Sequence, residues 1–249
     1  MIRYCFLFLL AFSCSGLFAQ DDEDNQGRFD EQVIGNTDSR DRLIMELNWN
    51  RWLNTPDSFN VQNKSRGFNF YFFYDIAIGG ENVAIAPGIG ISNSNIFHDS
   101  FLGQDTDSLS ATFEQTLVDP FSESLDFKKN KISLTYLEIP IEVRFRTNAN
   151  DKGQRFKIGL GFKGGLLINS HSKYVGDDTR AGALPNNPDF VKYKEHKIPN
   201  LRTFRYGATA RVGYGSVNLH AYYGVSTVFE TDKGPEANSL EIGISFNPF

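Results

Sequence analysis

Two short stretches of the chain carry residue types found in hydrolytic triads. His98-Asp99-Ser100 contains a histidine, an acid and a hydroxyl group, and Ser170-His171-Ser172 contains a histidine between two hydroxyl groups. The groups of a working triad converge from separate segments of a fold, and adjacent residues seldom reach that geometry. The chain also lacks the G-x-S-x-G, P-loop and H-E-x-x-H patterns. We therefore expect no enzyme, with an enzyme that uses loop residues as the weaker alternative.

The histidines and cysteines form no pattern of metal ligands. Four histidines are far apart in the sequence, three of them in predicted loops: His98, His171, His196 and His220. The two cysteines, Cys5 and Cys14, both lie in the first 19 residues, inside a predicted signal peptide. We expect no metal, no cofactor and no disulfide in the mature chain.

Charged residues of both signs recur at alternate positions, which places them on one face of several strands. Nine of them are predicted to form a charge network: Glu46, Asp75, Glu142, Arg144, Lys157, Lys163, Arg205, Arg211 and Glu241. The same face carries Glu138, Arg146 and His220. Buried charges are tolerated when they are paired and hydrogen-bonded. The pattern favours a structural ion network, and a narrow path for ions or small solutes is the alternative.

The strands that must position these charges follow from the period of the apolar residues. Large apolar side chains alternate with polar or small ones in eight runs, at residues 43–50, 68–78, 83–92, 137–146, 156–168, 204–214, 217–226 and 240–247. No amphipathic helix competes with them. Pro87 interrupts the third run, because proline removes a donor from the strand ladder. Ile132, Leu134 and Tyr136 precede the fourth run in opposite parity, which predicts a β-bulge near Tyr136.

The connections between the runs alternate in length. Residues 79–82, 148–153 and 213–216 are short turns, and longer polar loops span residues 55–65, 94–130, 169–200 and 230–239. Short turns at one end and long loops at the other are typical of outer-membrane barrels. An antiparallel sandwich has the same alternation of faces, and the loop lengths argue against it. We predict an all-β fold, an eight-stranded antiparallel up-and-down transmembrane barrel with long loops outside and short turns in the periplasm.

The N-terminus has the features of a secretory signal. Arg3 gives a positive start, residues 4–12 are apolar, and Ala19 ends the segment with the small residue that a signal peptidase requires. The apolar stretch is too short for a membrane anchor, and a lipoprotein modified at Cys14 is disfavoured by Phe12. We predict a signal peptide over residues 1–19, a flexible periplasmic lead-in over 20–41 and the barrel over 42–249.

Composition agrees with this organisation. The chain has 249 residues, with 23 Phe, 10 Tyr and 22 Gly, residue types that suit strands and close strand packing. The formal net charge of −5 is mild and acidic, which argues against a nucleic-acid partner because such a partner requires a basic stripe. After the signal segment, no run approaches the roughly 20 apolar residues of a membrane helix. A membrane location would therefore require a closed barrel.

One strand resembles a known family. Tyr136-Leu137-Glu138-Ile139-Pro140, continued by residues 141–145, resembles the signature strand of the PorT-like outer-membrane β-barrel family of Bacteroidetes, an OmpX- and OmpA-like eight-stranded barrel. The resemblance covers most of the mature chain in pattern and includes a C-terminal aromatic residue, Phe249. Phe249 is out of phase with the last predicted strand and follows Pro248, which departs from an in-phase terminal aromatic. The resemblance implies fold and location, and leaves the role open.

These expectations together describe a component of the cell envelope. We expect an outer-membrane barrel whose lumen is filled by side chains, because an eight-stranded barrel is only wide enough for them. Its partners would be outer-membrane lipid and other envelope proteins, the latter contacted through the outward loops.

Overall fold

The computed structural model describes residues 42–78, 82–106, 113–122, 125–178 and 191–247. All of them fall within one compact unit, residues 35–249. The predicted signal peptide, the predicted lead-in and Phe249 lie outside the described residues. No helix in the described ranges is long and apolar enough to cross a membrane.

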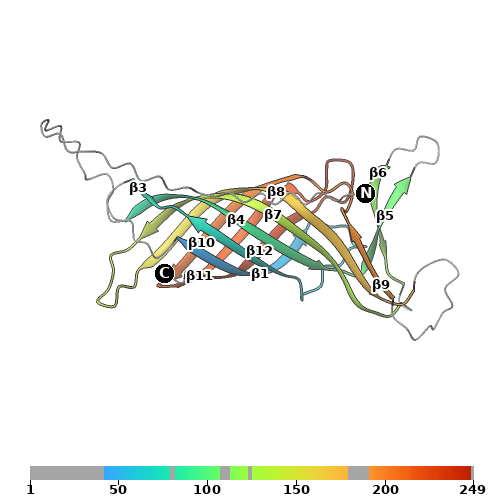
Figure 1. Ribbon diagram of the computed structural model, residues 1–249, viewed down its shortest axis with the longest axis horizontal. Coiled ribbons are helices and arrows are strands. Elements are labelled where there is room, and N and C mark those ends of the chain that lie inside the picture. Colours follow the sequence, from blue (N-terminus) through green and yellow to red (C-terminus); the bar gives the residue numbers. More distant parts are fainter. Residues whose placement is uncertain (1–41, 79–81, 107–112, 123–124, 179–190, 248–249) are drawn as a thin grey trace, which may run out of the picture. The chain divides into compact units, whose positions relative to one another are not determined.

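Eight antiparallel strands close into a barrel (Figure 1). Their bounds are β1 Leu43–Leu53, β2 Arg66–Phe73, β4 Val83–Phe97, β7 Phe127–Arg146, β8 Phe156–Gly176, β10 Phe204–Tyr214, β11 Val217–Thr227 and β12 Asn238–Phe246. Neighbours along this order pair with one another, β12 pairs with β1, and β8 pairs directly with β10. The barrel and its eight predicted strands are confirmed.

The second predicted strand is interrupted where its neighbour carries a proline. β2 ends at Phe73, and a two-residue strand, β3 (Ile76–Ala77), resumes the pairing with β4. The unpaired step lies opposite Pro87, between the pairs Phe73 with Gly88 and Ile76 with Ile85. Tyr74 N–H still donates to Pro87 O at 2.9 Å, but proline has no N–H with which to return the bond, so the β2–β4 ladder is interrupted here. The prediction of one continuous strand over 68–78 is therefore wrong at this step.

The outer wall of the barrel is an apolar belt. Along β7, for example, Leu137, Ile139, Ile141, Val143 and Phe145 point outward and are exposed. The other strands contribute exposed side chains of the same kind, among them Trp49, Phe68, Phe70, Ile89, Leu160, Phe204, Leu219 and Ile242. Exposed apolar surface of this extent is rare on soluble monomers and marks an interaction surface. The inward positions between these residues are mostly polar or charged.

Three of the barrel strands continue beyond the belt at the end with the long connections. β4, β7 and β8 extend there, and the connections add a hairpin of β5 (Ser100–Thr106) with β6 (Phe113–Pro120), and β9 (Val191–His196), which pairs with β8. In Figure 1 these additions stand at the end of the barrel opposite β3. The predicted loops over 94–130 and 169–200 are therefore partly strand. They were predicted as loops because these segments lack the continuous apolar outer face of the barrel strands.

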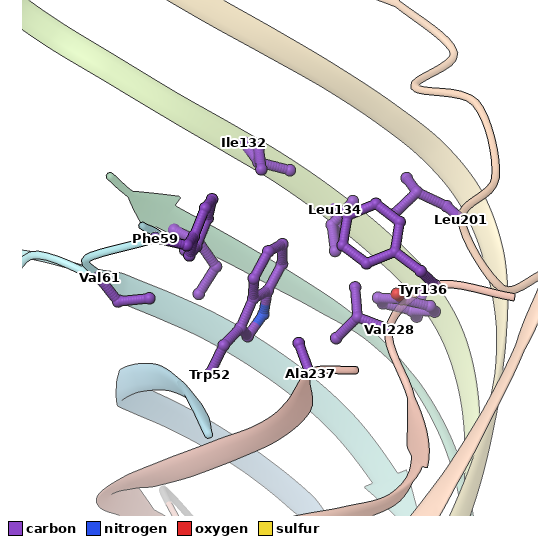
Figure 2. Packing of buried hydrophobic residues seen from close by; sticks show 11 residues of the cluster. Trp52, Phe59, Val61, Ile132, Leu134, Tyr136, Leu201, Val228 and Ala237 are labelled. Carbon is purple, nitrogen blue, oxygen red and sulfur yellow. The ribbon is translucent and has the colours of Figure 1, made fainter. Parts of the chain in front are cut away.

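The inward side of this extension is an apolar core, shown in Figure 2. Trp52 stacks on Phe59 with ring centroids 5.4 Å apart and meets Phe229 edge-on at 5.9 Å. The remaining members of this outer core are Val61, Ile96, Ile132, Leu134, Tyr136, Leu201, Val228 and Ala237. The core fills the barrel at its long-loop end.

The same core explains the parity change that was predicted as a bulge. A register shift does occur between Thr135 and Tyr136 in the pairing with β8. It does not invert β7, however, because Leu134 and Tyr136 are buried on the same inward side as Glu138. What changes along β7 is the chemistry of the inward face, from apolar in the extension to charged within the belt.

Candidate functional site: a charge network inside the barrel

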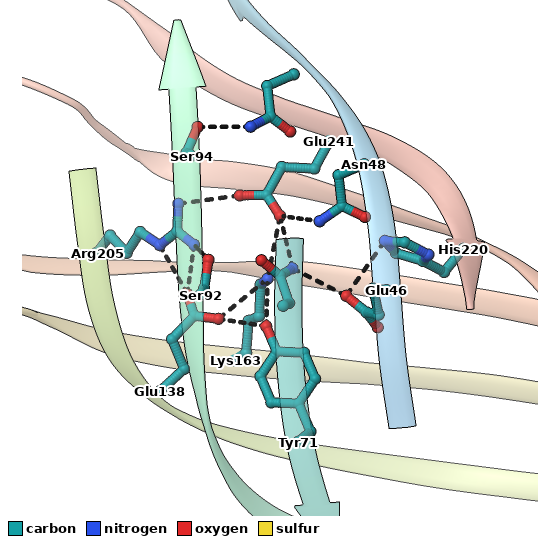
Figure 3. Close-up of polar contacts among 12 residues, drawn as sticks. Glu46, Asn48, Tyr71, Ser92, Ser94, Glu138, Lys163, Arg205, His220 and Glu241 are labelled. Atoms are coloured by element: carbon teal, nitrogen blue, oxygen red, sulfur yellow. Dashed lines mark hydrogen bonds and ion pairs between the residues drawn. The ribbon is translucent and has the colours of Figure 1, made fainter. Parts of the chain in front are cut away.

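A chain of ion pairs crosses the lumen inside the apolar belt (Figure 3). At its centre, Arg205 of β10 donates from Nε to Glu138 Oε1 at 2.7 Å and from Nη1 to Glu241 Oε1 at 3.0 Å. Lys163 of β8 lies between the same two acids, with Nζ 3.3 Å from Glu138 Oε2 and 3.5 Å from Glu241 Oε2. Two cations from the adjacent strands β8 and β10 therefore share two carboxylates, one from β7 and one from β12.

Neutral polar side chains complete this centre. The Tyr71 hydroxyl donates to Glu138, and Arg205 donates from Nη2 to Ser92 Oγ at 2.8 Å. Asn69 donates to Glu46 Oε2 at 2.9 Å and to Glu241 Oε2 at 3.3 Å, which joins the centre to the next group of charges. Charge-assisted hydrogen bonds of this kind offset the cost of burying each ion.

The second group continues toward the short-turn end. Arg211 of β10 donates from Nη2 to Glu46 Oε1 at 2.8 Å and to Glu142 Oε1 at 3.1 Å, and from Nη1 to Ser245 Oγ at 2.7 Å. His220 Nε2 lies 3.3 Å from Glu46 Oε2. One guanidinium thus bridges carboxylates that come from opposite sides of the barrel, since Glu46 is on β1 and Glu142 on β7.

The network ends near the short turns. Arg144 donates from Nε to Glu142 Oε2 at 2.9 Å and from Nη1 to Asp75 Oδ1 at 2.8 Å, and Arg146 also pairs with Asp75. Asp75 lies in the break between β2 and β3, where the chain is free to turn its side chain toward both arginines. Lys157, the remaining predicted member, is half-buried beside Arg146 in register and lines a small inner-end cavity with it.

The charges of this network balance. Five carboxylates pair with five cations: Glu46, Asp75, Glu138, Glu142 and Glu241 with Arg144, Arg146, Lys163, Arg205 and Arg211. Aromatic faces cover part of the cations, with Lys163 Nζ 4.1 Å from the Tyr222 ring centroid and Arg205 Cζ 4.0 Å from that of Tyr136. We name this set of ten residues the lumen network.

Little free space remains around the lumen network. The cavity beside Glu46, Lys163 and Arg211 and the one beside Arg144 and Lys157 each measure about 10 Å³. A volume of about 10–15 Å³ holds a single water molecule. Within the described residues, these two cavities give no room for a hydrated ion to pass.

Glycine provides the space that the long charged side chains occupy. A Cβ atom added to Gly165 would lie 3.0 Å from Cγ of Glu138 and 3.3 Å from Cγ of Arg205. Such contacts are tighter than ordinary van der Waals packing. The absence of a side chain at this inward position of β8 therefore lets the central ion pair form.

Most of the charged residues of the lumen network could be identified from the sequence, whereas their neutral hydrogen-bond partners could not. Glu138 was placed on the charged face but left out of the predicted network, although its side chain is fully buried at the centre. Tyr71, Asn69 and Ser92 were missed because neutral polar residues on an inward face carry no distinctive pattern. Strict alternation with Phe70 and Phe72, which are exposed, is the one signal that points Tyr71 inward.

The triad-type stretches have other contacts. The His98 ring stacks on Phe59 with centroids 4.8 Å apart, and Ser100 Oγ donates to Ser58 O at 2.7 Å. Burial, opposed by the weaker effect of Asp99, lowers the pKa of His98 to about 4. This histidine lies beyond the belt, in the wall of the outer core.

The second stretch is divided between the two faces of β8. Ser170 Oγ accepts a hydrogen bond from the backbone N–H of Ile198 at 3.1 Å. His171 faces outward toward His196, with ring centroids 5.9 Å apart. In the described part of the chain, no group of three or more His, Cys, Asp or Glu side chains is arranged to hold a metal ion.

A family comparison agrees with the architecture. Residues 18–230 match a family profile described as "Outer membrane protein beta-barrel domain". No curated protein matches the sequence. Among solved structures, Ail, the attachment invasion locus protein of Yersinia pestis in complex with the heparin analogue sucrose octasulfate, is similar at 10% identity and a TM-score of 0.32, over 82% of this chain and 95% of that chain.

Proposed function

The chain belongs to the outer-membrane β-barrel domain family, and from this premise we propose that it is a structural or interaction component of the cell envelope with a closed lumen. The apolar belt faces lipid, as the outer surface of a membrane barrel must. The barrel contacts other envelope molecules through its long-loop end.

The observation that carries this proposal is the filling of the lumen at two levels. Within the belt, the lumen network crosses the interior and leaves cavities of about 10 Å³. Beyond the belt, Trp52, Phe59 and Phe229 pack into the outer core. A conducting pore needs a continuous polar path of ion size, and both levels oppose one.

The long-loop end supports a role in interaction. It presents β9 and the β5–β6 hairpin, whose outer edges pair with no further strand among the described residues, and exposed strand edges and surface loops are common binding surfaces. In the proposed orientation this end faces outward. The short turns and both ends of the barrel chain, at Leu43 and Phe246, face the periplasm.

The same proposal includes a narrower family, a cleavage site for the signal peptide and a non-enzymatic role. The motif from Tyr136 to Pro140 supports membership of the PorT-like family. Cleavage after Ala19 would release a mature chain with residues 20–41 as a periplasmic lead-in. A non-enzymatic role is supported by the contacts of His98 and Ser100, which engage separate partners.

Single-channel recording tests the closed lumen. The full chain, folded and inserted in planar bilayers, is expected to give no steady current above the leak of the bilayer. The matched control is Lys152→Gln, which changes the charge of an exposed short turn and should be equally silent. A steady, charge-selective current through the parent protein would contradict the proposal and support the channel alternative.

A further inference from the structure

Five lysines stand together on the outward face of the long-loop extension. They are Lys129, Lys131, Lys173, Lys192 and Lys194, and we name this set the basic wall. In register, Lys131 of β7 lies opposite Lys173 of β8, which lies opposite Lys194 of β9. Lys129 and Lys192 flank Val175 in the next outward row.

The geometry of the sheet brings these charges close together. Directly opposite residues have Cβ atoms roughly 5 Å apart, and successive outward rows are about 7 Å apart along a strand. Phe97 of β4 continues the middle row, with Lys131 Nζ 5.9 Å and Lys64 Nζ 5.1 Å from its ring centroid. The basic wall therefore lies on three strands, β7, β8 and β9, and is bordered on β4 by Phe97.

The arrangement is electrostatically unfavourable by itself. The pKa of Lys131, beyond the belt, is lowered first by partial burial and then by the charges of Lys129, Lys173 and Lys194. Across the described residues, no carboxylate pairs with Lys173, Lys192 or Lys194. Like charges directly opposite in a sheet destabilise it, and an anion that binds among them would remove this cost.

Protection of a sheet edge does not account for the whole wall. Lysines on an edge strand discourage the addition of further strands, and β9 is the last strand on its side of the sheet. Lys131 and Lys173, however, each have a paired strand on both sides, and Lys129 lies on the same strand as Lys131.

The position of the wall relative to the belt indicates what it faces. Lys131 lies six residues beyond Leu137, the last exposed apolar residue on β7. That is about 20 Å along the strand and about 15 Å along the membrane normal at a tilt of roughly 40°. The wall is on the outside of the barrel and continues the lipid-facing surface, so its neighbours are the head groups of the surrounding leaflet.

We propose that the basic wall binds the phosphorylated sugars of an anionic glycolipid in the outer leaflet. Phosphate groups match closely spaced ammonium groups in charge, and a glycolipid places them at this height above its acyl chains. The apolar belt below the wall, at Leu137 and Ile168, would receive those chains. This inference rests on the outward orientation in the proposed function and does not depend on the closed lumen.

The test uses the full chain folded in neutral detergent and a phosphorylated rough lipopolysaccharide as the probe. Lys173→Gln/Lys194→Gln should weaken binding about tenfold or more at roughly 0.1 M salt, since each lysine near a charged surface contributes substantially. Lys152→Gln/Lys197→Gln changes the net charge equally at exposed sites outside the wall and should bind like the parent. Heat-modifiable migration should show that both variants fold.

Two further probes separate the sources of an effect. The parent should bind dephosphorylated lipopolysaccharide about tenfold more weakly than the phosphorylated form. Equal binding of both forms, or equal affinities of the two double variants, would overturn the proposal. Preference for a lipid-free sulfated polysaccharide over the glycolipid would also overturn it and indicate a soluble polyanion as the partner.

Orientation is tested separately on whole cells. The mature chain would have no cysteine, so Gly103→Cys at the long-loop end and Lys152→Cys at the short-turn end are unique labels. An impermeant maleimide should label the first and not the second. The reverse pattern would refute the orientation, whereas the correct pattern with no glycolipid preference would refute the basic wall alone.

Discussion

The lumen inside the belt and the extension beyond it are built by the same strands with opposite chemistry. Within the belt, β7 points Ile139 and Ile141 outward and Glu138 and Glu142 inward. In the extension, the same strand points Lys131 outward and Leu134 inward. Side chains keep alternating between the two faces along the whole of β7. Within the belt the apolar face points outward and the polar face inward, and in the extension this arrangement is reversed.

The surroundings of a β-strand, and not its geometry, decide which of its residues are buried. Lipid requires apolar side chains outside and leaves the polar ones to satisfy each other within the barrel. In water, charged side chains can stay on the outer surface, and burying apolar side chains in the interior is favourable. The boundary between the two regimes lies between Tyr136 and Leu137, where the exposed apolar residues of β7 begin.

The largest expected effect comes from breaking the lumen network. Arg205→Met leaves Glu138 and Glu241 without their shared guanidinium and should lower the free energy of unfolding by about 3–5 kcal/mol, the cost of stranding buried charge. Lys173→Met, the same kind of change in the extension, should alter it by less than about 1 kcal/mol. Urea titration with heat-modifiable migration as the readout measures both.

A compensating variant sharpens this result. Arg205→Met/Glu138→Met removes one charge of each sign and should recover part of the lost stability, because the remaining charges again balance. Equal effects of Arg205→Met and Lys173→Met would mean that water screens the lumen as it screens the outer surface, and the contrast between the two regions would not hold.

A lysine on the outer wall should be costly within the belt only. Ile141 is 51% exposed in the middle of the belt on β7, and Ile141→Lys should destabilise the folded barrel in lipid by about 2–4 kcal/mol. Val217→Lys, at the short-turn margin, should cost about 0–1 kcal/mol. Denaturant titration in lipid vesicles gives the two values, and a similar cost at both sites would argue against a lipid-facing belt.

The buried histidine of the extension should make stability depend on pH. The pKa of His98 is about 4 in the folded protein, against about 6.5 for an unfolded histidine. Between these values only the unfolded chain takes up the proton, so the stabilisation is complete above pH 6.5 and is lost as the pH falls toward 4. The total change is about 3 kcal/mol.

A titration-free variant isolates this contribution. His98→Gln cannot take up the proton, so the decrease in its unfolding free energy between pH 6.5 and 4 should be smaller than that of the parent. Urea titrations at four or five pH values would establish both slopes. Parallel slopes would show that His98 is solvated and that the outer core does not exclude water.

Much of the fold could be predicted from the sequence because a lipid-facing strand needs strict alternation. Runs such as residues 68–73 and 137–146 carry that pattern in full. The additions at the long-loop end could not be predicted in the same way. β9 alternates lysine with valine and tyrosine, and its pairing depends on β8 extending beyond the belt, which no local pattern indicates.

The candidate site was predictable in composition and not in pairing. Alternation places Arg205 and Glu241 on the inward face, but which carboxylate meets which cation depends on register across strands. Arg211 reaches Glu46, 165 positions earlier in the chain. Neutral partners such as Asn69 are found only once that register is known.

The way in which strands share the lumen network has a consequence for assembly. Glu46 and Asp75 come from the first hairpin region, whereas all five cations come from β7, β8 and β10. A barrel that has not yet joined β1 to β12 would leave Glu46, at one edge of the open sheet, away from Arg211 on β10, its partner in the closed barrel. Closing this seam therefore completes the hydrogen-bonded perimeter and pairs these two charges in one step, so partly inserted intermediates remain electrostatically unsatisfied until the first and last strands meet.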